Sequence, residues 1–261
     1  MPEDSGPRRV GAVTFDLWDT VFLDDSDEPK RKAQGLPPKK VARRDLVERF
    51  LAAAGPAVAR ETIDRAYDAV DEETRKTWHD EFVTLTVTQR LNKVLAALGR
   101  DLPPDRFAEL VRAHEEMELR ISPDLIPGAV DAVKALRGTR KLVVISDAIF
   151  TPGWGLRKLL EAAGILDAFT GFVFSDEFGK SKPASEVFHR AAAIAGCRVE
   201  EIVHVGDREH NDVGGPHAVG ARAVFVTVGL DRGSATTKAE RICRDFRELP
   251  GIIDSMDEGG H

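Results

Sequence analysis

The sequence predicts an α/β protein with an open, doubly wound parallel sheet and a separate all-helical domain inserted after the first strand. Short apolar runs rich in β-branched residues alternate with amphipathic helical patterns in the second half of the chain. A long block after the first apolar run shows helical periodicity instead. The length of 261 residues fits one large domain or two smaller ones.

Five runs have the length and composition of buried strands. They occupy residues 10–15, 141–146, 171–175, 201–206 and 222–227. Helical patterns between them cover residues 129–136, 156–163 and 183–195. Pro183 is expected to open the last of these helices, and Gly164 and Gly196 are typical stop signals. Right-handed crossovers between the strands then give an open doubly wound sheet.

The middle of the chain departs from this alternation. Helical patterns cover residues 40–54, 58–78, 85–98 and 105–120, and the only strand-like run is residues 83–87. We therefore expect a core domain from residues 1–23 and 124–261, and a helical domain from residues 24–123 above the ends of the strands. Residues 1–9 are polar and are expected to form a loose leader.

Composition excludes several classes of protein. The net charge of −7 disfavours a general nucleic-acid or anionic-membrane binder. No apolar run approaches the roughly 20 residues of a membrane span. Cys197 and Cys243 are too few for a disulfide framework and fit a reducing compartment, so a cytoplasmic location is expected. The oligomeric state is not predicted.

Basic side chains gather in residues 30–44, after an acidic stretch. They are Lys30, Arg31, Lys32, Lys39, Lys40, Arg43 and Arg44. We expect a solvated, mobile hinge between the two domains. The functional alternative is that these cations bind the anionic tail of a substrate when the helical domain closes.

Reactive side chains follow the predicted strands. Asp16 and Ser146 come at two strand ends, Asp207 and Asp212 follow a third, and Lys182 precedes a helix. Ligands bind at the carboxyl ends of the strands in such sheets, which predicts one shared crevice. Carboxylate oxygens suit Mg²⁺, Asp16 is a candidate nucleophile, and Ser146 and Lys182 could hold a phosphoryl group. Each residue alone has a structural explanation, such as a helix cap, a turn or a solvated side chain, but the ordered set favours catalysis.

Four segments resemble, in order, the four motifs of the haloacid dehalogenase superfamily: VTFDLWDTVF, VVISDA, GKSKPASEVF and VGDREHND. The resemblance implies a Rossmann-like core, a helical cap and Asp16 as the nucleophile. It further implies a Mg²⁺ ion held by Asp16, the backbone carbonyl of Trp18 and Asp207, with Asp212 as a further ligand or a supporting partner. The substrate is expected to contact Trp18, Asp19, Ser146, Asp147 and Lys182.

Position 18 departs from the superfamily pattern, because most of its phosphatases carry a second aspartate there as the general acid. Trp18 removes that help, which is typically worth about 10²- to 10⁴-fold in rate, and rescue by Asp19 is a hypothesis. Arg208 is a second departure. It stands where a small hydroxyl residue is common, and a structural role beside Asp207 is favoured.

The sequence therefore predicts a Mg²⁺-dependent hydrolase acting on the phosphoric monoester or acyl phosphate of a small metabolite through an aspartyl-phosphate. One alternative is a catalytically weak member with a ligand- or protein-binding role. The other is a phosphonatase or dehalogenase acting on carbon–phosphorus or carbon–halogen bonds. Trp18 favours substrates whose leaving group needs little protonation.

Overall fold

The computed structural model describes residues 9–257, so the predicted leader lies outside the described residues except for Arg9. Six parallel strands form one sheet in the order β5-β4-β1-β6-β7-β8. Their bounds are β1 (Ala12–Phe15), β4 (Lys141–Ser146), β5 (Gly171–Phe174), β6 (Ile202–Gly206), β7 (Arg222–Val226) and β8 (Arg241–Cys243). All five predicted strands are confirmed. β8 was missed because three residues are too few to show a pattern.

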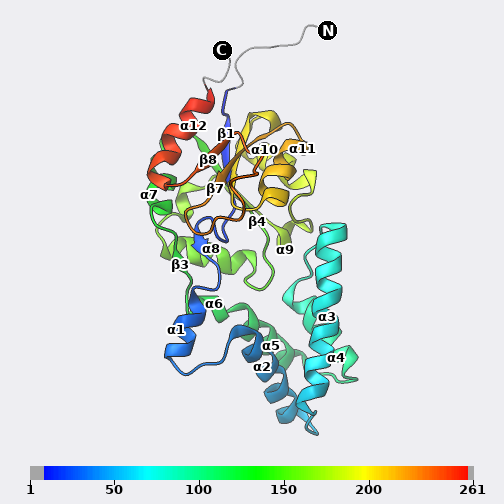
Figure 1. The fold of residues 1–261 in the computed structure, drawn as a ribbon. Coiled ribbons are helices and arrows are strands. Elements are labelled where there is room, and N and C mark those ends of the chain that lie inside the picture. Colours follow the sequence, from blue (N-terminus) through cyan, green and yellow to red (C-terminus); the bar gives the residue numbers. More distant parts are fainter. Residues whose placement is uncertain (1–8, 258–261) are drawn as a thin grey trace.

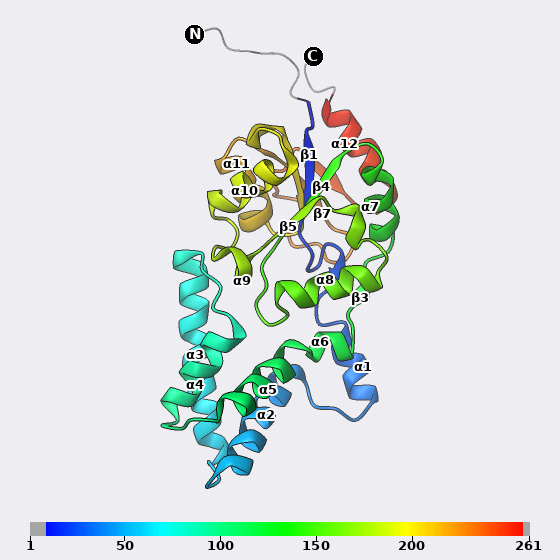
Figure 2. The ribbon, with the colours of Figure 1, turned by 180° about the vertical axis from the view of Figure 1, so that it is seen from behind.

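Apolar side chains alternate along the central strands and cover both faces of the sheet. Val13 and Phe15 of β1 pack in one cluster with α7 (Ala129–Arg137), α8 (Gly153–Ala162) and α12 (Leu249–Asp257). Ala12 packs in the opposite cluster against α10 (Ser185–Ala195). Figures 1 and 2 show helices on the two sides of the sheet. This alternation confirms a doubly wound α/β sheet.

The helices of residues 24–123 lie beyond one end of the sheet (Figure 1). They are α1 (Asp27–Ala33), α2 (Lys39–Ala54), α3 (Arg60–Glu81), α4 (Val87–Ala97), α5 (Pro104–Glu115) and α6 (Met117–Arg120). Helices α2 to α5 enclose their own apolar cluster, which includes Leu51, Ile63, Leu91 and Leu110. We refer to α1–α6 as the helical unit.

The chain enters and leaves the helical unit through a short antiparallel ribbon. Its strands are β2 (Phe22–Leu23) and β3 (Asp124–Leu125), and Phe22 pairs with Leu125. The Lys30 ammonium lies 2.6 Å from the Asp124 carboxylate. The two connections are therefore held side by side.

Three local expectations are wrong. Residues 83–87 form no strand, because Thr86 caps helix α4 through a reciprocal pair of bonds with Gln89. Pro183 does not open helix α10, because the turn closed by Ala184 N–H and the Ser181 carbonyl precedes the helix at Ser185. The predicted helix over residues 105–120 divides at Glu116 into α5 and α6.

The basic segment of residues 30–44 is not a solvated hinge. Four of its side chains are buried, namely Arg31, Lys39, Arg43 and Arg44. Arg31 donates to the carbonyl of Pro37, and Lys39 donates to Asp27 and Glu118 at 2.7 and 2.8 Å. Arg31, Lys39 and Arg44 find partners within the helical unit, so the segment is packed and not solvated.

The connecting segments include further short elements. They are α9 (Ser175–Phe178), α11 (Gly215–Ala218), the 3₁₀ turns η1 (Leu166–Ala168), η2 (Val199–Glu201) and η4 (Phe246–Glu248), and the π-helical turn η3 (Glu209–Gly214). The helices that the structure describes include none that is long and apolar enough to cross a membrane.

A buried histidine gives the helical unit a pH-dependent stability. His114 of α5 bonds the Tyr67 hydroxyl and the Leu110 carbonyl, each at 2.8 Å. Burial lowers its pKa to about 4, although the bond to Leu110 offsets part of that decrease. Between pH 6.5 and 4 the imidazole of His114 is protonated in the unfolded chain and neutral in the folded chain. His114 therefore contributes stability above pH 6.5, and that contribution is lost as the pH falls through 4.

We expect the pH dependence of the free energy of urea unfolding to report the protonation of His114. Between pH 7.5 and 4.5, the wild type should lose about 2.5 kcal/mol more unfolding free energy than His114→Gln, which cannot titrate. Parallel losses in the two proteins would mean that folded His114 accepts the proton.

Candidate active site

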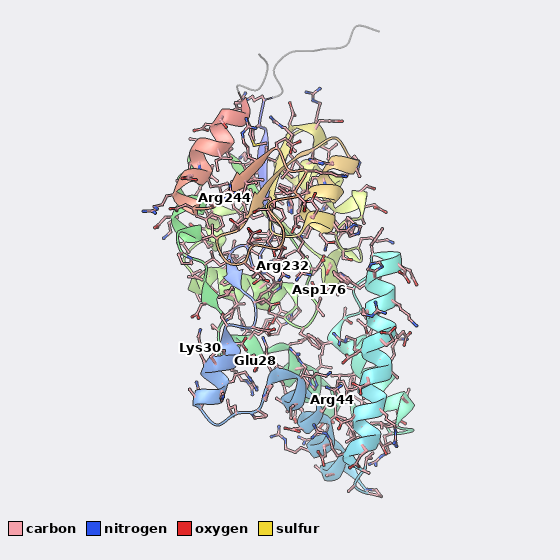
Figure 3. The ribbon with its side chains drawn as sticks, viewed as in Figure 1. Glu28, Lys30, Arg44, Asp176, Arg232 and Arg244 are labelled. Atoms are coloured by element: carbon pink, nitrogen blue, oxygen red, sulfur yellow. The ribbon has the colours of Figure 1, made fainter. Side chains whose placement is uncertain are left out.

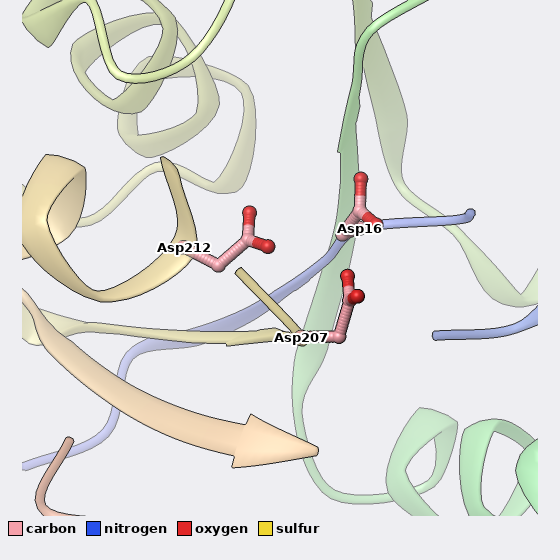
Figure 4. A group of neighbouring side chains, drawn as sticks. All are labelled: Asp16, Asp207 and Asp212. Carbon is pink, nitrogen blue, oxygen red and sulfur yellow. The ribbon is translucent and has the colours of Figure 1, made fainter. Parts of the chain in front are cut away.

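Three carboxylates meet where the central strands end. Asp16 directly follows β1, Asp207 directly follows β6, and Asp212 lies in the π-helical turn η3. One carboxylate oxygen from each lies within 4.8 Å of the others, and all three residues are buried (Figure 4). Asp212 reaches back over Gly206, where an added Cβ would lie 2.4 Å from its Cγ. The close approach therefore requires glycine at position 206.

Lys182 is the cation at the centre of this cluster. Its ammonium donates to Oδ1 of Asp16 at 2.6 Å and to Oδ1 of Asp212 at 2.7 Å. The side chain is only 2% exposed. The turn before α10 places it there, and its backbone N–H donates to Oδ1 of Asp147 at 3.1 Å. A buried ammonium needs such partners, because isolated burial of a charge is costly.

The pKa values follow from this pairing. Burial lowers the pKa of Lys182, but the charges of Asp16 and Asp212 raise it more, so the ammonium stays protonated. Burial raises the pKa of Asp212, but Lys182 and His204 lower it to a value well below the ordinary one. Burial raises the pKa of Asp16, and Lys182 opposes that increase.

A fully buried histidine supports Asp212 from behind. His204 on β6 bonds Oδ1 of Asp212 through Nε2 at 3.1 Å and the Thr14 hydroxyl through Nδ1 at 2.7 Å. Burial lowers its pKa, which favours the neutral ring. A histidine within an apolar strand is expected to be buried, but only the fold shows that its partner is a site carboxylate.

Asp207 is bound by an arginine from a distant loop. Nε of Arg232 lies 2.5 Å from Oδ2 of Asp207, and its terminal nitrogen lies 2.5 Å from Oδ2 of Asp19. Figure 3 shows Arg232 at the end of the sheet that faces the helical unit. Burial, with the charges of Asp16 and Asp212, raises the pKa of Asp207 to about 7.

The donor set fits Mg²⁺. Carboxylate oxygens are the ligands that this ion prefers, and three of them converge here. Oδ1 of Asp207 is buried and has no hydrogen-bond partner among the described residues. An unpaired buried carboxylate oxygen is costly, and a cation would satisfy it.

A cavity of about 400 Å³ opens between the sheet and the helical unit. The sheet contributes Asp16, Lys182 and Asp212, and the helical unit contributes Lys39 and Arg43, among other residues. Of the predicted site residues, Trp18 and Asp147 also line it. Ser146, Asp19 and Asp207 do not appear in its lining.

The side chains of Ser146 and Asp19 have different surroundings. Ser146 is buried, and its hydroxyl has no hydrogen-bond partner among the described residues. Asp19 has a left-handed backbone with a φ of 56°. Its carboxylate accepts from the backbone N–H of Asp24 at 3.0 Å and from Arg232. These contacts hold the Asp19 carboxylate against Arg232. Of these two neighbouring positions, Trp18 lines the cavity and Asp19 does not.

Trp78 and Arg208 complete the wall of the cavity. Nε1 of Trp78, on α3, donates to Oδ2 of Asp147 at 3.3 Å. This bond joins the helical unit to the loop after β4. The backbone N–H of Arg208 donates to Oδ2 of Asp212 at 2.9 Å. The backbone of Arg208 thus supports Asp212, and the structural role of its side-chain charge beside Asp207 stays a prediction.

Sequence analysis missed Arg232 and the site role of His204. No motif marks Arg232, since it lies in a loop without periodicity and far along the chain from both of its partners. A buried histidine among apolar neighbours on β6 was the available signal for His204.

Known proteins resemble the chain in sequence and fold. A model of the haloacid dehalogenase-like hydrolases matches residues 10–220. The chain is 29% identical over 229 residues to a glyceraldehyde 3-phosphate phosphatase from Methanopyrus kandleri, covering 86% of this chain and 85% of that protein.

Solved structures share the fold. The structure of a 2-haloacid dehalogenase from Pseudomonas syringae superposes with a TM-score of 0.68 at 21% identity, covering 94% of this chain and 99% of that one. The structure of the hydrolase YfnB from Bacillus subtilis, bound to magnesium, superposes with a TM-score of 0.58 at 19% identity over the same shares of each chain. The match to the family model identifies this chain as a member of the haloacid dehalogenase-like hydrolase family.

Proposed function

We propose that the chain is a Mg²⁺-dependent phosphatase that hydrolyses a small phosphorylated metabolite through a phosphorylated Asp16. The observation that carries this proposal is the pairing of a buried aspartate with a buried ammonium at the wall of the cavity. The relative from Methanopyrus kandleri, which is named a phosphatase and aligns with most of the chain, supports it.

The reaction begins at the Asp16 carboxylate. One of its oxygens attacks the phosphorus of the substrate, a bond from Asp16 to phosphorus forms, and the bond from phosphorus to the leaving oxygen breaks. Lys182 holds Oδ1 at 2.6 Å and the Thr20 hydroxyl donates to Oδ2 at 3.3 Å, so both oxygens are oriented. A water molecule then attacks the phosphorus of phosphorylated Asp16, the bond from phosphorus to the Asp16 oxygen breaks, and phosphate and the free Asp16 carboxylate result. One proton of the water stays on the phosphate, and the other passes through solvent to the departed leaving group.

Charge has to be neutralised before an anionic carboxylate can meet a phosphate dianion. The protonated Lys182 supplies one positive charge next to Asp16. Asp16, Asp207 and the backbone carbonyl of Trp18 are the proposed Mg²⁺ ligands, and Asp212 supports them or joins them. The ion, when bound, supplies further positive charge at the phosphoryl oxygens.

The leaving group departs beside Trp18, which cannot donate a proton to an oxygen in place of a carboxylic acid. Asp19 is engaged with Arg232 and with the backbone of Asp24, so the proposal assigns it no acid role. The preferred substrates are therefore expected to be acyl phosphates and esters of acidic alcohols, whose leaving groups need little protonation.

We expect hydrolysis of p-nitrophenyl phosphate to require both Mg²⁺ and Asp16. Nitrophenolate leaves without an acid, so Trp18 does not mask the reaction. Asp16→Asn removes the nucleophile and should lower kcat by about 10³-fold or more. Thermal melting checks that the variant is folded. A folded variant with wild-type turnover would refute the assignment of the nucleophile.

Aspartate at position 18 should restore acid catalysis. Trp18→Asp is expected to raise kcat on glycerol 3-phosphate, an ester of an unactivated alcohol, by about 10²- to 10⁴-fold relative to Trp18→Asn. The asparagine variant has nearly the same shape and no acidic proton, so it controls for the loss of the indole. Equal rates in the two variants would show that the rest of the site cannot use an acid there.

A further inference from the structure

A second chamber adjoins the catalytic cavity on the side of the helical unit. Its volume is about 340 Å³, and it shares wall residues with the catalytic cavity. The shared residues are Lys40, Arg43, Trp78, Ile149 and Phe150. Figures 1 and 2 show a loop that descends from the sheet between β4 and α8 toward the helical unit. The chamber therefore lies next to the place where the phosphoryl group is proposed to bind.

Cations outnumber anions in the lining of this chamber. Its charged residues are Lys40, Arg43, Arg75, Arg90 and Asp71. Asp71 forms an ion pair with Arg90, with 2.6 Å between Oδ1 and Nη2. Arg75 forms an ion pair with Glu72, with 2.8 Å between Nη2 and Oε1. These pairs leave Arg43 and Lys40 as the cations of the lining that have no ion pair among the described residues. Lys40 is exposed to solvent, but Arg43 is not.

Arg43 is a buried cation whose guanidinium lacks an anionic partner. The residue is 8% exposed, and its Nε makes no hydrogen bond to any described residue. Burial lowers the pKa of the guanidinium, and the charge of Glu118 offsets part of that decrease. Glu118 itself bonds Lys39 and Thr151. A buried guanidinium without a hydrogen-bonded anion is unfavourable, so the structure leaves a place for one.

The ring of Phe150 lies between the guanidinium groups of Arg43 and Arg90. The guanidinium carbon of Arg43 lies 3.4 Å from the ring centroid of Phe150, and that of Arg90 lies 4.0 Å from the same centroid. Nη1 of Arg90 is also buried without a hydrogen-bond partner among the described residues. The ring holds the planar group of Arg43 at the wall that the two chambers share, and a planar guanidinium with a free donor suits a carboxylate or phosphate.

We infer that Arg43, supported by Arg90 and Phe150, binds a second anionic group of the substrate, so that this enzyme selects phosphate esters that carry a carboxylate or a second phosphate. The inference rests on the proposed function, because it names the substrate class of that site. It refines the sequence-based alternative for residues 30–44. One residue of that segment carries the role, while Lys39 is already neutralised by Asp25, Asp27 and Glu118.

Calorimetric binding to Asp16→Asn protein tests the inference without turnover. One matched pair of ligands is 3-phosphoglycerate and glycerol 3-phosphate, of which only the first has a carboxylate. The other pair is fructose 1,6-bisphosphate and fructose 6-phosphate, which differ in the second phosphate. We expect the more anionic member of one pair to bind about 10- to 100-fold more tightly than its partner, as a charged hydrogen bond predicts. The pair that discriminates identifies the anion.

Substitutions then assign the preference to Arg43. Arg43→Gln, added to Asp16→Asn, should abolish the difference in affinity within the discriminating pair. Arg43→Lys should retain part of it, because the charge remains and the planar fork is lost. Arg49→Gln is the matched control, since Arg49 lies on the same helix, faces the ring of Phe50 at 5.8 Å and is exposed. It should leave the preference unchanged, and thermal melting verifies the fold of each variant.

The outcomes separate this inference from the proposed function. Equal binding within both pairs, or a preference that survives in folded Arg43→Gln protein, would overturn the role of Arg43. Wild-type hydrolysis of p-nitrophenyl phosphate tests the phosphatase itself and does not depend on a second anion. If the wild type hydrolyses p-nitrophenyl phosphate but neither ligand pair shows a difference in affinity, only the role of Arg43 is refuted. If one pair shows the difference but p-nitrophenyl phosphate is not hydrolysed, the proposed function is refuted and the anion site stands.

Discussion

The site depends on the ion pairs that the Lys182 ammonium makes with Asp16 and Asp212. The ammonium lies among carboxylates that strand ends and a turn bring into one buried cluster. Without it, Asp16 and Asp212 would repel each other in a region from which water is largely excluded, and removing one partner of such a buried pair typically costs about 3–5 kcal/mol. The positive charge of Lys182 offsets the repulsion between the buried carboxylates. It also reduces the repulsion between Asp16 and an anionic substrate.

Other contacts are arranged around that cluster in two layers. From inside the sheet, His204 and Thr14 fix the orientation of Asp212. From the loop before β8, Arg232 joins Asp207 to Asp19. His204 binds the same oxygen of Asp212 as Lys182 does, and Arg232 binds Oδ2 of Asp207, so each carboxylate is held in one orientation.

The helical unit gives the cavity its second wall. The β2–β3 ribbon holds the entering and leaving chains together, and the bond between Trp78 and Asp147 joins the two sides of the cavity. The chemistry of the phosphoryl group belongs to the strand ends, whereas the unpaired guanidinium of Arg43 belongs to the helices. This separation lets one side of the cavity carry the reaction while the other side selects the substrate.

The sequence by itself determined the sheet, its five longest strands and the order of the reactive residues, because these features are written in local periodicity and in motifs at strand ends. Asp16, Lys182, Asp207 and Asp212 were predicted to converge, and they do. Only the tertiary structure decided the partners of Arg232, Asp19 and Arg43. Each of these contacts joins segments far apart along the chain, and a basic residue that finds a buried partner looks the same in sequence as one that stays in water. For the same reason the segment of residues 30–44, predicted to be a mobile hinge, became part of a packed wall.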